Sequence, residues 1–165
     1  MAPQRIPLHP SLKALGERVR AEDPFLSRIR SIGNKISLAL PLSPPCRFEL
    51  LQSDRVNAYA LPGNLVALTL GAVRLAGDDA GIAGLLGHEI AHLLLRHRRR
   101  GSAQEFEADR VGRQLAVEAG FDRDGLKNFL EGFDRLLSAS PDALRSFSHP
   151  PTRQRLEKLG LFEQG

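Results

Sequence analysis

The chain has 165 residues, a formal net charge of +4 and a mean hydropathy of −0.22. Its one cysteine, Cys46, excludes an internal disulfide and a zinc site built from cysteines. No apolar run reaches the roughly 20 residues of a membrane span, and the N-terminal segment lacks the apolar core of a signal peptide. We expect a single domain over residues 1–165 without membrane contact of its own, although a natural anchor or a removed loop stays possible.

The first half of the chain predicts two helices followed by a small sheet. Residues 1–10 are rich in proline and read as a loose arm. Apolar residues then recur at helical spacing over 11–20 and 24–38. After the proline-rich segment 41–46, short apolar runs separated by turn residues predict strands at 47–52, 56–60 and 65–70.

The second half predicts helices only. A helix begins at Asp78 or Asp79 and runs to about Arg98, with Gly101 as a stop. Further helices are expected over residues 102–120, 122–138 and 150–160. Helices, then a small sheet, then helices indicate an α+β domain.

The sequence HEIAH places two histidines four residues apart on the first of these helices. His88 and His92 therefore share one helix face, with Glu89 on its flank. Neutral imidazoles suit Zn²⁺, which acidifies a bound water, and a neighbouring carboxylate can take the proton. The pattern predicts one zinc ion per chain.

A catalytic zinc needs a third protein ligand. His97 lies five residues after His92, about 140° around the helix axis, and we expect it to point away. Glu105 and Asp109 share a face of the next helix, so one can bind the metal while the other holds a ligand imidazole. Glu107 projects about 200° from Glu105, and we choose Glu105 as the ligand.

Four motifs occur in a recognisable order: VNAYALPGNLVALTLGAV, HEIAH, EFEAD and FSHPPTRQRLEKL. They resemble those of the zinc metallopeptidases that include HtpX, the CAAX prenyl proteases and their soluble bacterial relatives. The resemblance runs from about Arg47 to Leu159. It implies a minigluzincin-like domain, in which a small sheet with an edge strand packs on a zinc helix and a glutamate helix.

The resemblance also implies roles for individual residues. His88, His92 and Glu105 become the zinc ligands, Glu89 becomes the general base that activates the zinc-bound water, and Asp109 supports a zinc histidine. The expected activity is zinc-dependent cleavage of peptide bonds in proteins or peptides.

The family pattern adds residues outside the two helices. It places His149 near the metal, where it helps stabilise the oxyanion or occupies the open position in a resting state. An extended substrate would bind along an edge strand by β-augmentation. The expected substrate-binding residues are Asn57, Ala58, Tyr59, Ala60 and Arg155.

Several features allow a second interpretation. Ser102 and Glu105 form the pattern of a capping box, which would turn the Glu105 carboxylate away from a metal. Asp109 could pair with a surface arginine, His149 could only end a loop, and Arg155 could be a solvated helix residue. The basic run RHRRR allows phosphate binding, but it lacks interleaved aromatic residues and also suits a helix C-terminus, so we expect no nucleic acid.

The two motif helices are separated by a short connection. Twelve residues lie between His92 and Glu105, where many relatives carry a long insert. The turn near 98–101 is either natural or an engineered linker, and it also permits exchange of helices between two copies. A latent or non-proteolytic protein acting in assembly or quality control is the alternative function. The compartment stays open between bacterial periplasm and cytoplasm.

Overall fold

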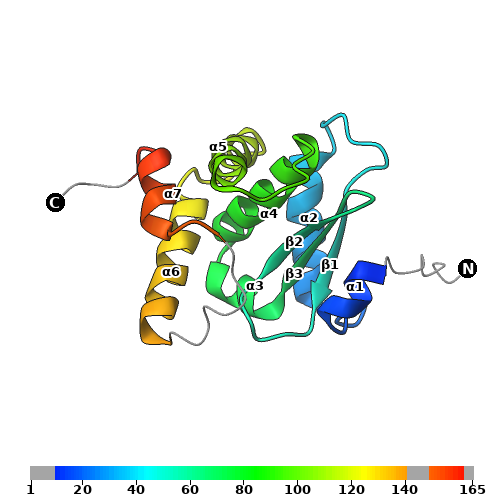
Figure 1. The fold of residues 1–165 in the computed structure, drawn as a ribbon. Helices are drawn as coiled ribbons and strands as arrows, with labels where there is room; N and C mark the ends of the chain where they lie inside the picture. Colours follow the sequence, from blue (N-terminus) through cyan, green and yellow to red (C-terminus); the bar gives the residue numbers. More distant parts are fainter. Residues whose placement is uncertain (1–9, 141–148, 162–165) are drawn as a thin grey trace, which may run out of the picture.

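The computed structural model describes residues 10–140 and 149–161 as helices around a small sheet (Figure 1). The α+β class predicted from the element order is confirmed. The proposed arm at residues 1–10 lies almost wholly outside the described residues. In chain order the elements are α1 (Pro10–Leu15), α2 (Pro24–Ser37), β1 (Arg47–Leu51), β2 (Ala58–Leu61), β3 (Leu65–Thr69), α3 (Leu70–Ala76), α4 (Asp79–Leu94), α5 (Ser102–Glu118), α6 (Gly125–Ala139) and α7 (Thr152–Lys158).

The first helix is shorter than its apolar spacing predicts. α1 ends at Leu15 because Gly16 adopts a left-handed φ of 133°, and the expected helix over residues 11–20 is therefore wrong beyond this point. The following residues turn toward the sheet, where the Val19 N–H donates to the Leu50 carbonyl at 3.0 Å. α2 forms as expected, with Pro24 at its start and the Asp23 side chain accepting from the Phe25 N–H.

The three predicted strands form one mixed sheet in the order β1-β3-β2. β1 runs parallel to β3, and β2 runs antiparallel to it through a turn with positive φ at Gly63 and Asn64. Among the described residues β2 pairs with β3 alone, so the 56–60 segment lies at a sheet edge as expected. α3 was not predicted; the Thr69 side chain caps it by accepting from the Ala72 N–H.

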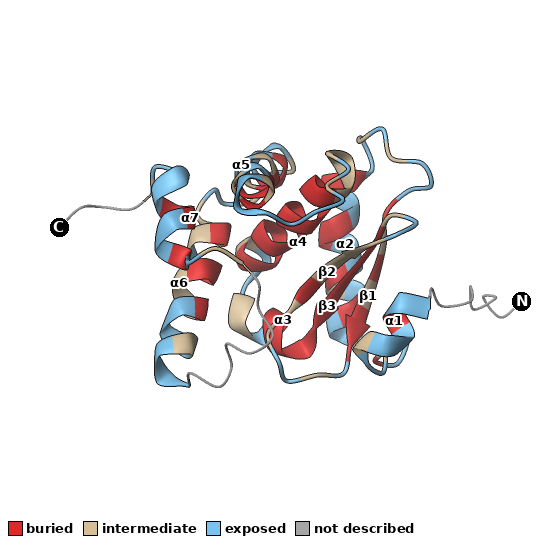
Figure 2. Ribbon diagram, in the orientation of Figure 1, coloured by how far each residue is buried: buried red, intermediate tan, exposed pale blue. Residues whose placement is uncertain are grey.

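α4 is the central element of the fold, and Figure 2 shows it buried along most of its length. All residues from Gly81 to His92 are buried, since α2, the sheet, α5 and α6 surround the helix. Asp78 caps its start by accepting from the Gly81 N–H at 2.8 Å. A helix covered on all sides holds its polar side chains away from water, so those on α4 need partners from neighbouring elements.

α5 packs on α4 at a point where neither helix has a side chain. A Cβ on Gly87 would lie 2.4 Å from the Gly112 carbonyl oxygen, and one on Gly112 would lie 2.5 Å from the Gly87 backbone. Two glycines therefore let the helix backbones touch. This contact sets the distance between the side chains that the two helices present to each other.

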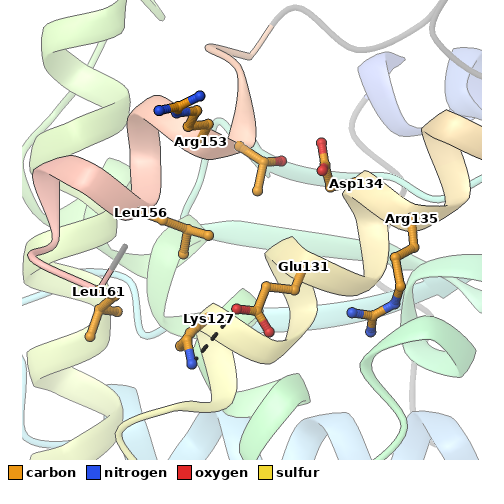
Figure 3. Close-up of a pocket in the computed structure, with 8 residues that line it drawn as sticks. Lys127, Glu131, Asp134, Arg135, Arg153, Leu156 and Leu161 are labelled. Atoms are coloured by element: carbon orange, nitrogen blue, oxygen red, sulfur yellow. Dashed lines mark ion pairs between the residues drawn. The ribbon is translucent and has the colours of Figure 1, made fainter. Parts of the chain in front are cut away.

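α6 and α7 complete the helical side of the molecule and enclose a hollow between them (Figure 3). Its volume is about 350 Å³, and its walls include the Lys127–Glu131 ion pair, Arg153 and Leu156. None of the predicted site residues lines this hollow. Charged side chains supply much of its open lining, whereas most ligand pockets are lined mainly by apolar side chains, so we assign it no function.

Candidate metal centre

The contact between α4 and α5 brings the two predicted motifs together. His92 lies against Glu105, His88 against Asp109, and Gly87 against Gly112, so partners move back along one helix as they advance along the other. The helices therefore run in opposite directions, as the short connection requires. α4 ends at Leu94 rather than at Arg98, and this earlier end gives the chain room to turn.

His88, His92 and Glu105 form a group that could hold a metal ion, with one ligand atom from each residue within 4.8 Å of the others. The two Nε2 atoms of the histidines lie 3.1 Å apart. The carboxylate oxygens of Glu105 lie 3.3 Å from His88 Nε2 and 3.2 Å from His92 Nε2. All three side chains are buried.

These separations are close to the ligand–ligand edges of a tetrahedral metal, with the two Glu105 distances measured to different oxygens. Zn–N and Zn–O bonds of about 2.05 Å give ligand–ligand edges of about 3.3 Å. Oε1 of Glu105 is fully buried and accepts no hydrogen bond from the described residues, although His92 Nε2 is near. Two ring nitrogens and a carboxylate oxygen that converge in this way are the donors that zinc prefers.

The Glu105 carboxylate is ionised. Burial would raise its pKa, but the adjacent imidazoles of His149, His88 and His92 outweigh this and lower the pKa well below its usual range. The alternative interpretation as a capping box is wrong, because Gly101 is the N-cap of α5 and no side chain caps this end. Glu105 therefore faces the histidines, as the metal-site interpretation requires.

Asp109 and Arg155 support His88 from behind. Nδ1 of His88 lies 2.8 Å from Asp109 Oδ1, and Arg155 donates to both Asp109 oxygens at 2.8 and 2.6 Å. Burial would raise the pKa of Asp109, but these hydrogen bonds hold it at about 2. Burial likewise lowers the pKa of His88, yet its bonds to Asp109 and Glu105 raise it to about 9. The carboxylates therefore favour a positive charge here, which a metal cation supplies.

Arg155 lies in the interior of the protein. Its side chain is 6% exposed and donates to Asp109, so it is not the solvated helix residue of the second interpretation, and its expected contact with a substrate stays a prediction. Asp109 likewise pairs with Arg155 and His88 in the interior, not with a surface arginine. Local sequence patterns could not reveal this pairing, because Arg155 lies 46 positions after Asp109.

Two further side chains close the centre. His149 Nδ1 lies 2.5 Å from Glu105 Oε2, near the ligand group as expected. Arg100 donates to Glu89 Oε2 at 3.0 Å. Glu89 is 1% exposed and His92 is 3% exposed, so the side chains of both residues are shielded from solvent. Burial also lowers the pKa of His92, which favours the neutral imidazole that binds metals.

His97 contradicts its prediction. It does not point away, since its Nδ1 lies 2.9 Å from His92 Nδ1 and its Nε2 lies 3.1 Å from Glu107 Oε2. The prediction assumed that α4 continues to Arg98, whereas the helix has already ended at Leu94. Glu107 is exposed and is not among the grouped ligands, which agrees with its rejection in favour of Glu105.

The predicted substrate residues lie on or next to β2. Asn57 precedes the strand, where its side chain donates to the Tyr59 hydroxyl at 2.8 Å and accepts from the Ala58 N–H at 2.9 Å. Tyr59 and Ala60 are partly exposed, whereas Ala58 is buried. β2 also packs against α4, so the sheet edge lies beside the helix that carries the histidines.

The fold and this group define a class: an α+β protein with a buried His-His-Glu centre able to hold a metal. Residues 27–104 match the family described as Peptidase family M48. The resemblance predicted from the motifs is thereby confirmed over this segment, which is similar to the M48 peptidases.

Individual relatives agree with this family. A beta-barrel assembly-enhancing protease of Yersinia pestis is 26% identical over 184 residues, which cover 79% of this chain and 38% of that protein. The protein of the same name from Escherichia coli (strain K12) is 27% identical over 187 residues, with 81% and 38% covered. The mitochondrial metalloendopeptidase OMA1 of Schizosaccharomyces pombe is 24% identical over 150 residues, with 67% and 44% covered.

The chain spans 38% of the length of the first two of these relatives. Within the described residues, no helix is both long enough and apolar enough to cross a membrane.

Proposed function

We propose that this chain is a zinc-dependent metalloendopeptidase domain. The observation that carries the proposal is the convergence of His88, His92 and Glu105 beside Glu89 on α4. The M48 match and the protease names of the relatives support it. His88, His92 and Glu105 would hold the metal, which when bound acidifies a water molecule and polarises a peptide carbonyl.

The residues around the metal would each have a separate role in catalysis. Glu89 takes the proton of the attacking water and returns it to the leaving amine, as a general base and then a general acid. Asp109 accepts the Nδ1 hydrogen of His88 and so keeps Nε2 directed at the metal. His149 lies beside Glu105, close enough to the ligand group to assist a developing oxyanion.

An extended polypeptide is the substrate that the sheet favours. β2 offers an edge, and main-chain hydrogen bonds along it would align a peptide beside α4. Neighbouring residues of a strand direct their N–H groups to opposite sides, so Tyr59→Pro and Ala60→Pro form a matched pair. The variant that loses the outward N–H should raise KM while keeping its fold, whereas the other should unfold more easily. Equal KM values for wild type and both variants would contradict this binding mode.

The decisive experiment measures zinc content and cleavage of an unfolded protein such as casein. Wild type should bind one zinc per chain and cleave, whereas Glu89→Gln should bind zinc and lose cleavage. Glu118→Gln, on the exposed end of α5, is the matched control and should behave as wild type. Cleavage that survives Glu89→Gln, or a wild type that binds no zinc, would refute the proposal.

A latent form of the same domain is the second candidate. His149 pairs with the buried Glu105, and Arg100 pairs with the buried Glu89. These contacts occupy both carboxylates and so favour a latent form. The two relatives named for beta-barrel assembly suggest a role in assembly or quality control. Latency predicts that wild type binds zinc but cleaves poorly, and that His149→Ala increases cleavage. Full cleavage by wild type with no gain in His149→Ala would exclude it.

A further inference from the structure

The turn after α4 directs His97 back onto the metal centre. Arg96 adopts a left-handed φ of 55°, its N–H donates to the Leu93 carbonyl, and the His97 N–H donates to the His92 carbonyl at 3.0 Å. This pair of hydrogen bonds is the Schellman arrangement, in which glycine usually holds the left-handed position. Here Arg96, which does not favour the left-handed conformation, occupies that position. The turn places the His97 side chain against His92.

The His97 ring has a partner at each nitrogen. Nδ1 lies 2.9 Å from His92 Nδ1, and the two rings meet edge to face with centroids 5.1 Å apart. Nε2 lies 3.1 Å from Glu107 Oε2. The His97 side chain is 8% exposed and the Glu107 side chain is 46% exposed, so the ring itself is largely shielded from water while the carboxylate lies at the surface.

These contacts, together with the proposed metal site, select one arrangement of hydrogens. If His92 binds a metal through Nε2, its neutral ring carries hydrogen on Nδ1 and must donate to His97. His97 must then accept at Nδ1 and carry its hydrogen on Nε2, where Glu107 accepts it. Each donor therefore meets an acceptor along the whole chain from His92 to Glu107.

The opposite arrangement fails at both ends. A hydrogen on His97 Nδ1 would make His92 Nδ1 the acceptor and place the hydrogen of His92 on Nε2, which then cannot bind a metal. It would also leave the bare Nε2 of His97 facing the Glu107 carboxylate, so two acceptors would oppose each other. Glu107 thus favours the form of His97 that leaves His92 ready for a metal.

We propose that His97 and Glu107 are positioning residues for His92, a role that rests on the proposed metal site. They hold the His92 ring with hydrogen on Nδ1 and keep Nε2 directed toward Glu105 and His88. His88 has a separate support, provided by Asp109 and Arg155. Each ligand imidazole therefore has its own carboxylate partner. Asp109 contacts His88 directly, whereas Glu107 acts on His92 through His97.

The first test compares zinc affinities, measured by competition with a chromophoric chelator. His97→Leu should weaken zinc binding roughly 10- to 100-fold, the usual effect of losing a ligand's outer partner. His97→Gln should recover most of the affinity, because its amide oxygen can accept from His92 Nδ1. Glu107→Leu should fall between them, and Glu118→Leu on the same helix should match wild type. Thermal unfolding of each metal-free variant identifies any that fail to fold.

The second test determines which ring nitrogen of His97 carries the hydrogen. A long-range ¹H–¹⁵N NMR spectrum of the zinc-loaded wild type should show His97 with hydrogen on Nε2 alone, and Glu107→Leu should show a mixture of both forms. Hydrogen on Nδ1 of His97 in wild type, or equal zinc affinity in wild type and His97→Leu, would overturn the positioning role. A wild type that binds no zinc would instead overturn the metal site and this role together.

Discussion

Loss of the Arg155 guanidinium should destabilise the protein far more than loss of a surface arginine. Arg155 makes two hydrogen bonds to Asp109, and their side chains are 6% and 0% exposed. Arg155→Ala would leave the Asp109 carboxylate buried without its main partner. Removing one member of a buried pair costs about 3–5 kcal/mol, because the remaining charge is uncompensated. We therefore expect the free energy of unfolding of the metal-free protein to fall by about this amount.

Urea denaturation in the presence of a chelator measures this change. With a slope of about 2 kcal/mol per molar urea, the midpoint should fall by about 1.5–2.5 M. Arg155→Lys, which keeps the charge but not the two-pronged donor, should fall between Arg155→Ala and wild type.

Arg153 on the same helix provides the matched control. It pairs with Glu157 four residues later, and its side chain is 70% exposed. Arg153→Ala should therefore change the free energy of unfolding by no more than about 0.5 kcal/mol. Equal midpoints for Arg155→Ala and Arg153→Ala would refute the argument that the buried pair holds α7 against α5.

Three other outcomes follow from the described contacts. Gly112→Ala should lower the free energy of unfolding by about 1–3 kcal/mol, because its Cβ would lie 2.5 Å from the backbone of α4. Gly132→Ala, whose Cβ would meet the side chains of Leu75 at 3.4 Å and Arg135 at 3.8 Å, should stabilise by about 0.5–1 kcal/mol, and urea midpoints in the reverse order would contradict this. Zinc at 100 times its Kd should add about 2.7 kcal/mol of stability, and a thermal scan showing the same gain in Glu105→Ala would exclude Glu105 as a ligand. Cys46 is buried and its thiol pKa is raised by burial, so it should react slowly with a thiol reagent until denaturant is added; rapid labelling of the native chain would be inconsistent with this packing.

Local patterns predicted much of the fold because the relevant signals are short-range. The three strands and α2 lie close to their expected bounds, since apolar spacing and turn residues mark both ends. α3 was missed because its apolar residues follow β3 without a break, and only the Thr69 side chain marks the change from strand to helix. The first helix was predicted too long because its apolar spacing continues past Gly16, where the backbone leaves the helical region.

The ligand group was within reach of sequence reasoning, whereas its surroundings were not. His88 and His92 lie four residues apart on α4, and Glu105 and Asp109 lie four residues apart on α5, so each pair shares one face of its helix. The position of His97 depends on where α4 ends, and the signal for that end is a left-handed Arg96, a residue that rarely takes this conformation. The burial of Arg155 depends on a contact between distant parts of the chain, which no local pattern contains.

The connection between α4 and α5 consists of two parts, a turn that closes on α4 and a segment that leads into α5. The turn that carries His97 is closed by hydrogen bonds to Leu93 and His92, both belonging to α4. Arg100, at the other end, adjoins Gly101, which is the N-cap of α5. A foreign segment grafted between Arg98 and Arg99 would therefore lengthen the connection without opening the turn behind it. The site is compatible with loops of very different size, provided that they depart after His97.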